Sequence, residues 1–596
     1  MHHATHRPSR PRARLALALG AWLAASGATR GQPALALEPD MAEDIARMAA
    51  DVDEYARFFD IRWSEELLDA QHEFLRSRLD ALRATDFDRL GQAGRVDYLL
   101  MRNNLRSAIS ANRLSRQHLG EMDPLLPFRG VIVPLERARW RMTPLDPRAA
   151  AGELAKIPEA AKAARAWAEA RRARPDRPAD APPLLSPVIA QRAARATEQL
   201  TRSLERWYEY YDGFEPAFSW WCAKPYEGAK QALGKLSRFL REEIAGVRGK
   251  PEDPLIGDPI GREALLEALR DECVGRSPED LIAIGDAEFA WCEAEMKRAA
   301  AEVGLGDDRR AALARVKQDS PGPGEQTAYV TAVAREAVQF LKDRDLVTIP
   351  DLCDQTWRIQ MISPETQRVL PFAVYYGQAI GVAYPTSAMP HEDKLMSMRG
   401  NNRHFTRIVV PHELIPGHHL QRYLSNRERP YRLRFDTPFY VEGWALHWEM
   451  RLWDLGWART PEERIGMLFW RMHRCARITV SLRFHLGEMS PAQMVDFLVD
   501  RVGHERFGAT SEVRRYIGGD YGPLYQAGYM IGGKQVRALW RETTKAGGGG
   551  SMTERAFHDA VLGVGPIPIE LVRAQLLGTP LNRDSEAAWA FPTDQP

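Results

Sequence analysis

One decapeptide combines the residue types that metal-dependent hydrolysis requires. Residues 412–421 read HELIPGHHLQ, and this segment holds three of the 15 histidines of the chain. Imidazole is the commonest neutral metal ligand in proteins, and a neighbouring carboxylate can act as a base on water at the metal. His412, with His418 or His419, would supply the imidazoles, and Glu413 would supply the carboxylate. The segment therefore predicts a metal site with a general base beside it.

The spacing of these histidines differs from the zincin pattern HExxH, in which two histidines four residues apart share one face of a helix. His418 follows His412 by six residues, which is about 120° around an ideal helix, so a regular helix would keep the two imidazoles apart. Pro416 and Gly417 lie between them, and both residues favour a break in the helix. If that break loops out, the segment becomes HExxH with His418 as the second ligand. We prefer His418 to His419 on this ground and leave both open.

Glu442 is the candidate for a third ligand from a second helix. It lies in the apolar, aromatic run FYVEGWALHWE of residues 439–449, where an unpaired carboxylate is costly and a cation would offset that cost. Glu449 follows two helical turns later on the same face, where it could hold a ligand from behind. The alternative for Glu442 is an exposed acid at a helix start, favoured by the helix dipole. Two histidines and one carboxylate suit zinc, although the residues alone do not exclude manganese or cobalt.

A hydrolase of this kind also needs a donor that faces the oxyanion of the transition state. Tyr529, in the run YQAGYMIG, is one candidate because small residues flank it, and His485 is another. A packed core tyrosine is the alternative for Tyr529. In the expected mechanism Glu413 takes a proton from water and passes it to the leaving amine. Further candidates for lining a cleft are Arg477, Arg515, Tyr516 and residues 375–377.

Helices must position most of these residues. Apolar residues recur at spacings of three and four in long stretches, of which the clearest are 41–110, 154–172, 189–211 and 277–341. Runs that resemble strands are few, and the best are 369–385 and 407–410. The pattern predicts a mainly α protein with a small β element near the helix that carries His412.

The first 36 residues have the layout of a secretory signal peptide. Four arginines precede an apolar run at 15–25, which is too short to cross a bilayer, and small residues follow it. A basic tail before a buried helix is the alternative. We expect residues 1–36 to be removed and residues 37–596 to form a single large helical catalytic region. A division of that region into two lobes around a cleft, at about 37–350 and 351–596, stays open. The protein would be periplasmic or secreted.

Composition and charge exclude several classes of protein. The chain has 596 residues, of which 44% are apolar and 27% are charged, as in an ordinary globular protein. The 81 lysines and arginines balance 80 acidic residues, so a dedicated nucleic-acid binder, which needs a basic surplus, is not expected. No later stretch has the length of apolar sequence that a membrane helix needs, so we expect no stable membrane span. The oligomeric state stays open.

Four blocks of the sequence resemble a known family. They are HELIPGHHLQ, EGWALHWE, RCARITVSLRFH and YQAGYMIGGKQ, and they are similar to the bacterial domain-of-unknown-function family 885. The resemblance covers about residues 40–578. That family is grouped with the gluzincin-like metallopeptidases, so the resemblance implies a largely helical metallopeptidase-like fold with a substrate cleft. It also implies that His412, His418 and Glu442 bind zinc and that Glu413 is the general base.

One block departs from the family pattern. The family usually has an Asp-Thr-Gly run before the histidine that aligns with His485, whereas this chain has Ser481, Leu482 and Arg483. The consequence of that replacement stays open. We expect an exported zinc metallopeptidase that cleaves short peptides. The alternatives are a hydrolase of a non-peptide amide and a non-catalytic metal-containing binding protein.

Overall fold

The computed structural model describes residues 40–593, apart from positions 60, 62, 251–252, 368–369, 371 and 520. The signal peptide predicted for residues 1–36 lies outside these positions. Within them the chain is mainly helical with one three-stranded sheet, which confirms the predicted fold class. No single helix among the described residues is long and apolar enough to cross a membrane; two short helices meet that test only when taken together across a bend of 117°.

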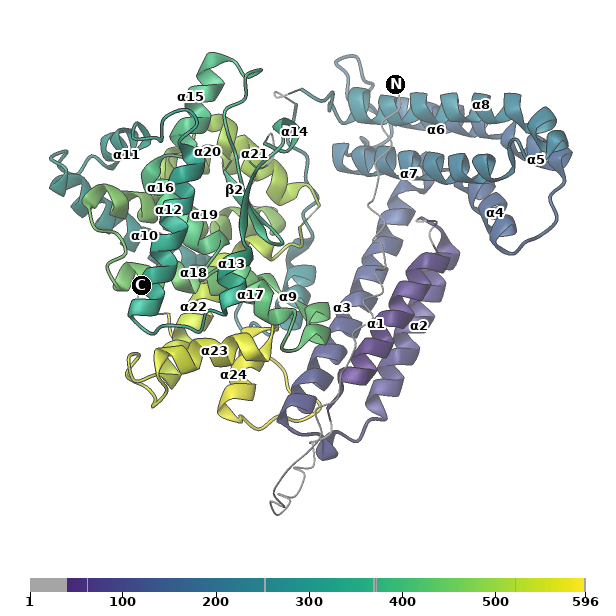
Figure 1. Ribbon diagram of the computed structural model, residues 1–596. Coiled ribbons are helices and arrows are strands. Elements are labelled where there is room, and N and C mark those ends of the chain that lie inside the picture. The colour runs from purple at the N-terminus through teal and green to yellow at the C-terminus, as the bar shows by residue number, and fades with distance from the viewer. Residues whose placement is uncertain are drawn as a thin grey trace, which may run out of the picture.

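Three helices near the N-terminus run along one side of the molecule (Figure 1). They are α1 (Ala42–Phe58), α2 (Glu65–Arg83) and α3 (Gln92–Met122). Asp97 of α3 forms a fully buried ion pair with Arg432, with 2.8 Å between Oδ1 and Nη2. Arg432 lies in a short helical turn at Pro430–Phe435 and also donates to the carbonyl oxygen of Val564. This buried pair therefore ties the first helices to the last part of the chain.

Five further helices form a bundle that projects from the rest of the molecule and that we call the arm (Figure 1). They are α4 (Arg129–Trp140), α5 (Pro147–Leu154), α6 (Ile157–Glu169), α7 (Pro187–Tyr211) and α8 (Pro216–Arg238). The arm has its own hydrophobic core, which includes the small side chains of Ala164, Ala193 and Ala229 and the large ring of Trp207. Burial of such apolar surface is what holds this bundle together.

The remaining elements form what we call the body, which carries the candidate site. Its helices are α9 (Gly261–Asp271), α10 (Pro278–Glu302), α11 (Arg309–Lys317), α12 (Gln326–Asp343), α13 (Asp351–Thr356), α14 (Pro364–Gln367), α15 (His391–Gly400), α16 (Arg403–Glu413), α17 (His418–Ser425), α18 (Pro438–Asp454), α19 (Pro461–His485), α20 (Pro491–Phe497), α21 (Arg506–Ile517), α22 (Tyr525–Thr543), α23 (Glu554–Val564) and α24 (Ile569–Leu577). Short turns of other helical types lie at 87–89, 123–125, 239–244 and 498–502.

The long helix α19 forms the centre of the body. From Ile465 to His485 every residue except Arg483 is buried, so the helix is enclosed by α10, α16 and α22 on its different faces. Its start is well defined, because the side chain of Thr460 accepts a hydrogen bond from the backbone N–H of Glu463. A helix buried all round can place charged side chains deep in the protein, and α19 does so at several positions.

The small sheet lies beside α16, as the sequence predicted. Its strands are β1 (Arg358–Met361), β2 (Ala373–Tyr376) and β3 (Ala379–Val382), in the order β1-β3-β2. β1 is parallel and β2 antiparallel to β3, and Tyr375 pairs with Ile380. The second predicted strand, at 407–410, is wrong, because these residues belong to α16. Their continuous apolar run is buried on several sides of a helix, and a short apolar run does not distinguish that from a buried strand.

Residue 350 does not divide the hydrophobic core. One cluster of buried side chains joins residues 265–337 to residues 380–591, and a second joins residues 41–105 to residues 338–572. The third cluster, at 61–245, belongs mainly to the arm. The boundary that the described core supports is therefore the one between the arm and the rest of the chain. All five cysteines are buried and unpaired.

Candidate metal centre

A break between α16 and α17 brings the first two predicted ligands together. The backbone N–H of Gly417 donates to the carbonyl oxygen of Pro411 at 3.0 Å, so the chain folds back over the end of α16. A Cβ atom at Gly417 would lie 1.7 Å from the carbonyl oxygen of His412, so only glycine fits there. The indole N–H of Trp444 donates to the carbonyl oxygen of Pro416 at 2.8 Å and holds the break against α18. The predicted break is confirmed, and it delivers His418 to the ring of His412.

Three side chains converge at this point. Oε2 of Glu442 lies 3.3 Å from Nε2 of His418 and 3.6 Å from Nε2 of His412. The three candidate ligand atoms all lie within 4.8 Å of one another, and all three residues are buried. In a tetrahedral zinc site with bonds of about 2.0–2.1 Å, neighbouring ligand atoms lie ~3.4 Å apart. The donor set and its spacing therefore fit a zinc ion.

The charges around the His412 imidazole also favour a cation at this site. Nδ1 of His412 lies 2.7 Å from Oε1 of Glu449, and its Nε2 lies 3.6 Å from Oε2 of Glu442. Nδ1 and Oε2 are both buried without a hydrogen bond of good geometry among the described residues. Two buried carboxylates thus flank one imidazole, an arrangement that favours a cation there. Burial lowers the pKa of His412, but Glu442 and Glu449 raise it to about 9, so the two carboxylates favour positive charge at this imidazole.

Side chains behind the three candidate ligands hold their orientation. Glu449, which the sequence placed on the same face as Glu442, holds the far nitrogen of His412. The hydroxyl of Tyr525 donates to Oε1 of Glu442 and leaves Oε2 directed at the two imidazoles. Burial raises the pKa of the Glu442 carboxyl, but the two histidines lower it further, so the pKa lies well below its usual range. The carboxylate is therefore available as an anionic ligand.

Close packing of α18 against α22 brings Tyr525 to Glu442. A Cβ atom at Gly532 would lie 2.1 Å from the carbonyl oxygen of Phe439, and one at Gly443 would lie 2.5 Å from the backbone of Gly532. The two backbones are in direct contact, which residues larger than glycine would prevent. This contact fixes the side chains of α22 next to those of α18.

The other histidines near the motif point elsewhere. Nε2 of His419 lies 2.9 Å from the carbonyl oxygen of Cys353, and its Nδ1 lies 3.3 Å from the hydroxyl of Tyr375. Nε2 of His447 lies 3.0 Å from Nε2 of His558 in the apolar core. Of the two alternatives that the sequence left open, the geometry thus brings His418, and not His419, to His412 and Glu442.

Glu413 adjoins His412 in the sequence, and Tyr529 has its ring near that imidazole. Glu413 is the last residue of α16, is 9% exposed, and its carboxylate makes no hydrogen bond or ion pair with the described part of the chain. The ring of Tyr529 is parallel to the imidazole of His412, with 6.3 Å between centroids. Burial and then Glu442 raise the pKa of Tyr529 to about 12, so it is a neutral hydrogen-bond donor at neutral pH. Their catalytic roles stay predictions.

His485 is not brought to this group. It is the last residue of α19, and Arg474 lies eleven positions earlier, or ~16 Å along the helix. Among the described residues, no hydrogen bond or ion pair joins His485 to the three converging side chains. Its Nδ1 and Oγ of Ser481, one turn earlier, are both buried without a partner. Arg483 is 40% exposed and faces Asp286 at 3.9 Å. The replaced run before His485 therefore leaves a gap in hydrogen bonding away from the site.

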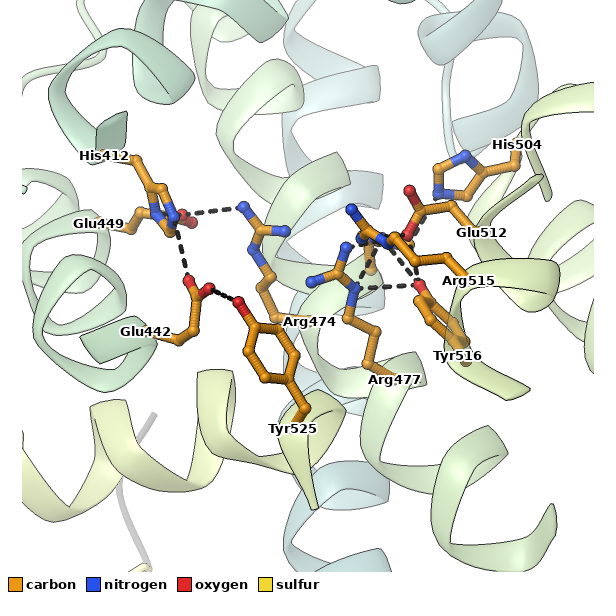
Figure 2. Close-up of polar contacts among 11 residues, drawn as sticks. His412, Glu442, Glu449, Arg474, Arg477, His504, Glu512, Arg515, Tyr516 and Tyr525 are labelled. Atoms are coloured by element: carbon orange, nitrogen blue, oxygen red, sulfur yellow. Dashed lines mark hydrogen bonds and ion pairs between the residues drawn. The ribbon is translucent and has the colours of Figure 1, made fainter. Parts of the chain in front are cut away.

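A second buried polar group, which the sequence indicated only in part, lies close to the candidate ligands (Figure 2). Its members come from α19 and α21 and from the turn between α20 and α21: Arg474, Arg477, His473, His504, Glu512, Arg515 and Tyr516. The guanidinium groups of Arg477 and Arg474 lie 4.3 and 4.8 Å from the centre of the Tyr529 ring. Glu512 was missed because a single acid on an amphipathic helix carries no sequence signal, and Tyr525 was missed because it shares a face with Tyr529.

The comparisons with known proteins give a family and a fold. The family described as "Bacterial protein of unknown function (DUF885)" matches residues 47–576. A solved structure titled "putative lipoprotein of unknown function", from Shewanella oneidensis, is 16% identical with a TM-score of 0.65 and covers 90% of this chain and 100% of its own. A second "putative lipoprotein", from Colwellia psychrerythraea, is 17% identical with a TM-score of 0.54 and covers 86% of this chain and 91% of its own. These likenesses show the fold. A comparison with curated proteins gave no match.

Proposed function

The chain belongs to the DUF885 family, and from this premise we propose that it is an exported zinc-dependent metallohydrolase, most simply a peptidase of short peptides. The observation that carries the proposal is the convergence of two imidazole nitrogens and one buried carboxylate oxygen, from His412, His418 and Glu442. The four sequence blocks resemble a family that is grouped with gluzincin-like metallopeptidases, and this supports the same class of reaction. The layout of residues 1–36 supports export.

Zinc held by these three side chains would supply Lewis-acid chemistry, polarising a substrate carbonyl and lowering the pKa of water towards ~7. Glu413 takes the proton of the attacking water and returns it to the leaving amine, because its carboxylate is free and adjoins His412 in the sequence. The Tyr529 hydroxyl donates a hydrogen bond to the carbonyl oxygen as that oxygen gains charge. Glu449 and Tyr525 hold His412 and Glu442 in their orientations.

The test combines metal analysis of the purified protein with digestion of a mixed peptide library read by mass spectrometry. The wild-type protein is expected to hold one zinc ion and to cleave peptides. Glu413→Gln removes only the base, so it should keep the zinc and lose turnover by about 10²–10⁴-fold. His412→Ala should lose both zinc and turnover.

Three results would separate the alternatives. Normal turnover by Glu413→Gln would refute the assigned base. Cleavage of acylated amines without cleavage of any peptide would favour a hydrolase of non-peptide amides. Stoichiometric zinc with no hydrolysis of any substrate, and equal ligand affinity in Glu413→Gln, would favour a binding protein. Trp220→Ala, which changes an exposed ring on the arm, is the matched control for handling and folding.

A further inference from the structure

Arg477 has a buried donor without a hydrogen bond of good geometry to the described residues. The residue is 3% exposed, its Nε donates to the Tyr516 hydroxyl at 3.0 Å, and its Nη2 donates to Oε2 of Glu512 at 2.9 Å. Nη1 is buried and has no hydrogen-bond partner among the described residues. A guanidinium group holds its charge permanently, and an unpaired N–H of a buried charge is costly. The position therefore points to a group that arrives from outside the chain.

The charges around Arg477 leave an excess of positive charge. Oε2 of Glu512 accepts from Nη2 of Arg477 and from Nη2 of Arg515, each at 2.9 Å, so one carboxylate serves two guanidinium groups. Arg474 shares Glu449 with His412 and reaches it only at 3.4 Å. Nε of Arg474 and Nε of Arg515 are also without partners. Three guanidinium groups thus share two carboxylates, and the missing partner is an anion.

This cluster adjoins the metal centre and reaches the surface. The Arg477 guanidinium group lies 4.3 Å from the centre of the Tyr529 ring, and the imidazole of His412 lies 6.3 Å from the same centre. On the other side Arg515 is 16% exposed and lies 5.7 Å from the ring of Tyr521. Tyr521 in turn contacts Tyr525, whose hydroxyl binds Glu442, with 4.4 Å between ring centroids. Half-buried side chains therefore connect the solvent with both Arg477 and the candidate ligands.

We propose that Arg477, supported by Arg474 and Arg515, binds a carboxylate of the substrate on the leaving-group side of the scissile bond. The substrate class is then peptides and acylated amino acids that end in a free carboxylate close to the bond that is cleaved. The inference rests on the proposed hydrolase function and adds the class of substrate. Arg477 is the specificity-determining residue, and Glu512 with Tyr516 positions it. A planar guanidinium group suits this role because it can hold a carboxylate through two parallel hydrogen bonds.

The first test measures binding rather than turnover. Zinc-loaded Glu413→Gln protein is incubated with one peptide library prepared in two forms, with free carboxylate ends and with amide ends, and the retained peptides are quantified by mass spectrometry. Retention of the carboxylate form should exceed that of the amide form by about 10- to 100-fold, the value of a charge-assisted hydrogen bond of 1.5–3 kcal/mol. Equal retention of the two forms, including retention of neither, would overturn the inference.

The second test removes the guanidinium group. Arg477→Met in the Glu413→Gln background should reduce retention of the carboxylate form to that of the amide form and leave the amide form unchanged. Arg471→Met is the matched control, because Arg471 is as buried on the same helix but is bound to Glu288 instead. Arg477→Lys keeps a charge in the network, so it should fold if Arg477→Met does not, and it should lose most of the preference. A preference for carboxylate ends that survives in Arg477→Lys would also overturn the inference.

Turnover by the wild-type protein separates the two proposals. If peptides with carboxylate ends are cleaved and their amides are not, both proposals stand, and cleavage internal to long amidated peptides would refute only the role of Arg477. If neither form is cleaved but the carboxylate form is retained through Arg477, the proposed hydrolysis fails while the carboxylate site stands. Libraries with Asp or Glu side chains near an amidated end distinguish a terminal carboxylate from a side-chain carboxylate as the bound group.

Discussion

The arm and the body are both built from packed helices, yet they bury different chemistry. In the arm, Glu136 is the one charged side chain that the described residues bury, and the core is formed by alanines, leucines and aromatic rings. In the body, α19 alone buries Arg471, His473, Arg474 and Arg477. The arm therefore forms a buried helical core with almost no charged side chains, whereas the core of the body contains many.

The difference teaches that the buried charges of the body are not needed to make a helical core. Desolvating a charge costs several kcal/mol, and a hydrophobic replacement of a buried ion pair is often neutral or stabilising. The arm shows that this chain can form apolar cores where only stability is required. We therefore attribute the buried charges next to the candidate ligands to the proposed function, and the two regions should respond differently to mutation and to acid.

The largest expected effect is on the core of the arm. Trp207 is fully buried, and its ring contacts that of Phe218 at 5.2 Å between centroids. Trp207→Ala should lower the free energy of unfolding by about 3–5 kcal/mol, because it leaves a cavity. Trp220, 83% exposed on the next helix, is the control, and its replacement should cost at most ~0.5 kcal/mol. Chemical denaturation measures both, and a loss of zinc by folded Trp207→Ala would break the separation of the two regions.

A buried acid of the body should matter next, and more than the buried acid of the arm. Glu288 binds both Arg471 and Lys534, and all three side chains are at most 7% exposed. Glu288→Gln removes a buried charge that faces two buried cations and should cost about 3 kcal/mol or more. Glu136→Gln removes a charge that faces one cation, Arg139, which is 20% exposed, and should cost about half as much. Equal losses in denaturation midpoint would contradict the comparison.

The support behind the candidate ligands should affect metal binding. Glu449→Gln keeps the size of the side chain but weakens its hold on Nδ1 of His412. Zinc affinity at pH 7, measured by competition with a chelator, should fall about 10- to 100-fold. Glu159→Gln on the arm, where the side chain is 79% exposed, should leave the affinity unchanged. An unchanged affinity in Glu449→Gln would remove this residue from the metal centre.

Mild acid should weaken the body before the arm. Burial lowers the pKa of His504 and of His558 to about 3, whereas residues 129–238 of the arm contain no histidine. Below pH ~6.5 these two histidines take up protons in the unfolded chain but stay neutral in the folded chain. Their contribution to the free energy of unfolding is therefore complete above that pH and is lost as the pH falls towards 3. Each histidine should cost about 1.4 kcal/mol at pH 5.5. Hydrogen exchange at pH 7.5 and 5.5 should show lost protection in α23 and around His504, with α7 and α8 least affected.

Much of the fold was predictable from local sequence patterns. The helical stretches were visible because a helix that buries one side repeats apolar residues every three to four positions. The small sheet was located by its apolar run, whereas residues 407–410 were assigned to the wrong element because a helix buried on several sides loses that periodicity. The break in HELIPGHHLQ was predictable because proline and glycine act on the backbone where they stand.

The choice among equivalent residues was not predictable in the same way. His418 and His419 are neighbours of identical type, and Tyr525 and Tyr529 share one helical face, so the sequence could only propose one of each pair. The structure chose His418 through the turn at Gly417, and it added Tyr525 through the backbone contact of Gly443 with Gly532. His485 was proposed from its position in a family motif, but its place at the end of α19 keeps it away from the three converging side chains.

By itself the sequence determined which elements form, where the helix at His412 breaks, and which residue types could bind a metal. Only the tertiary structure decided that Arg477 lies behind Tyr529 with an unpaired donor, and that Glu512 from another helix holds it there. The physical reason is the separation in sequence over which each interaction acts. Backbone preferences act over a few residues and leave a periodic trace, whereas a buried ion pair joins positions far apart in the chain and depends on how whole helices pack.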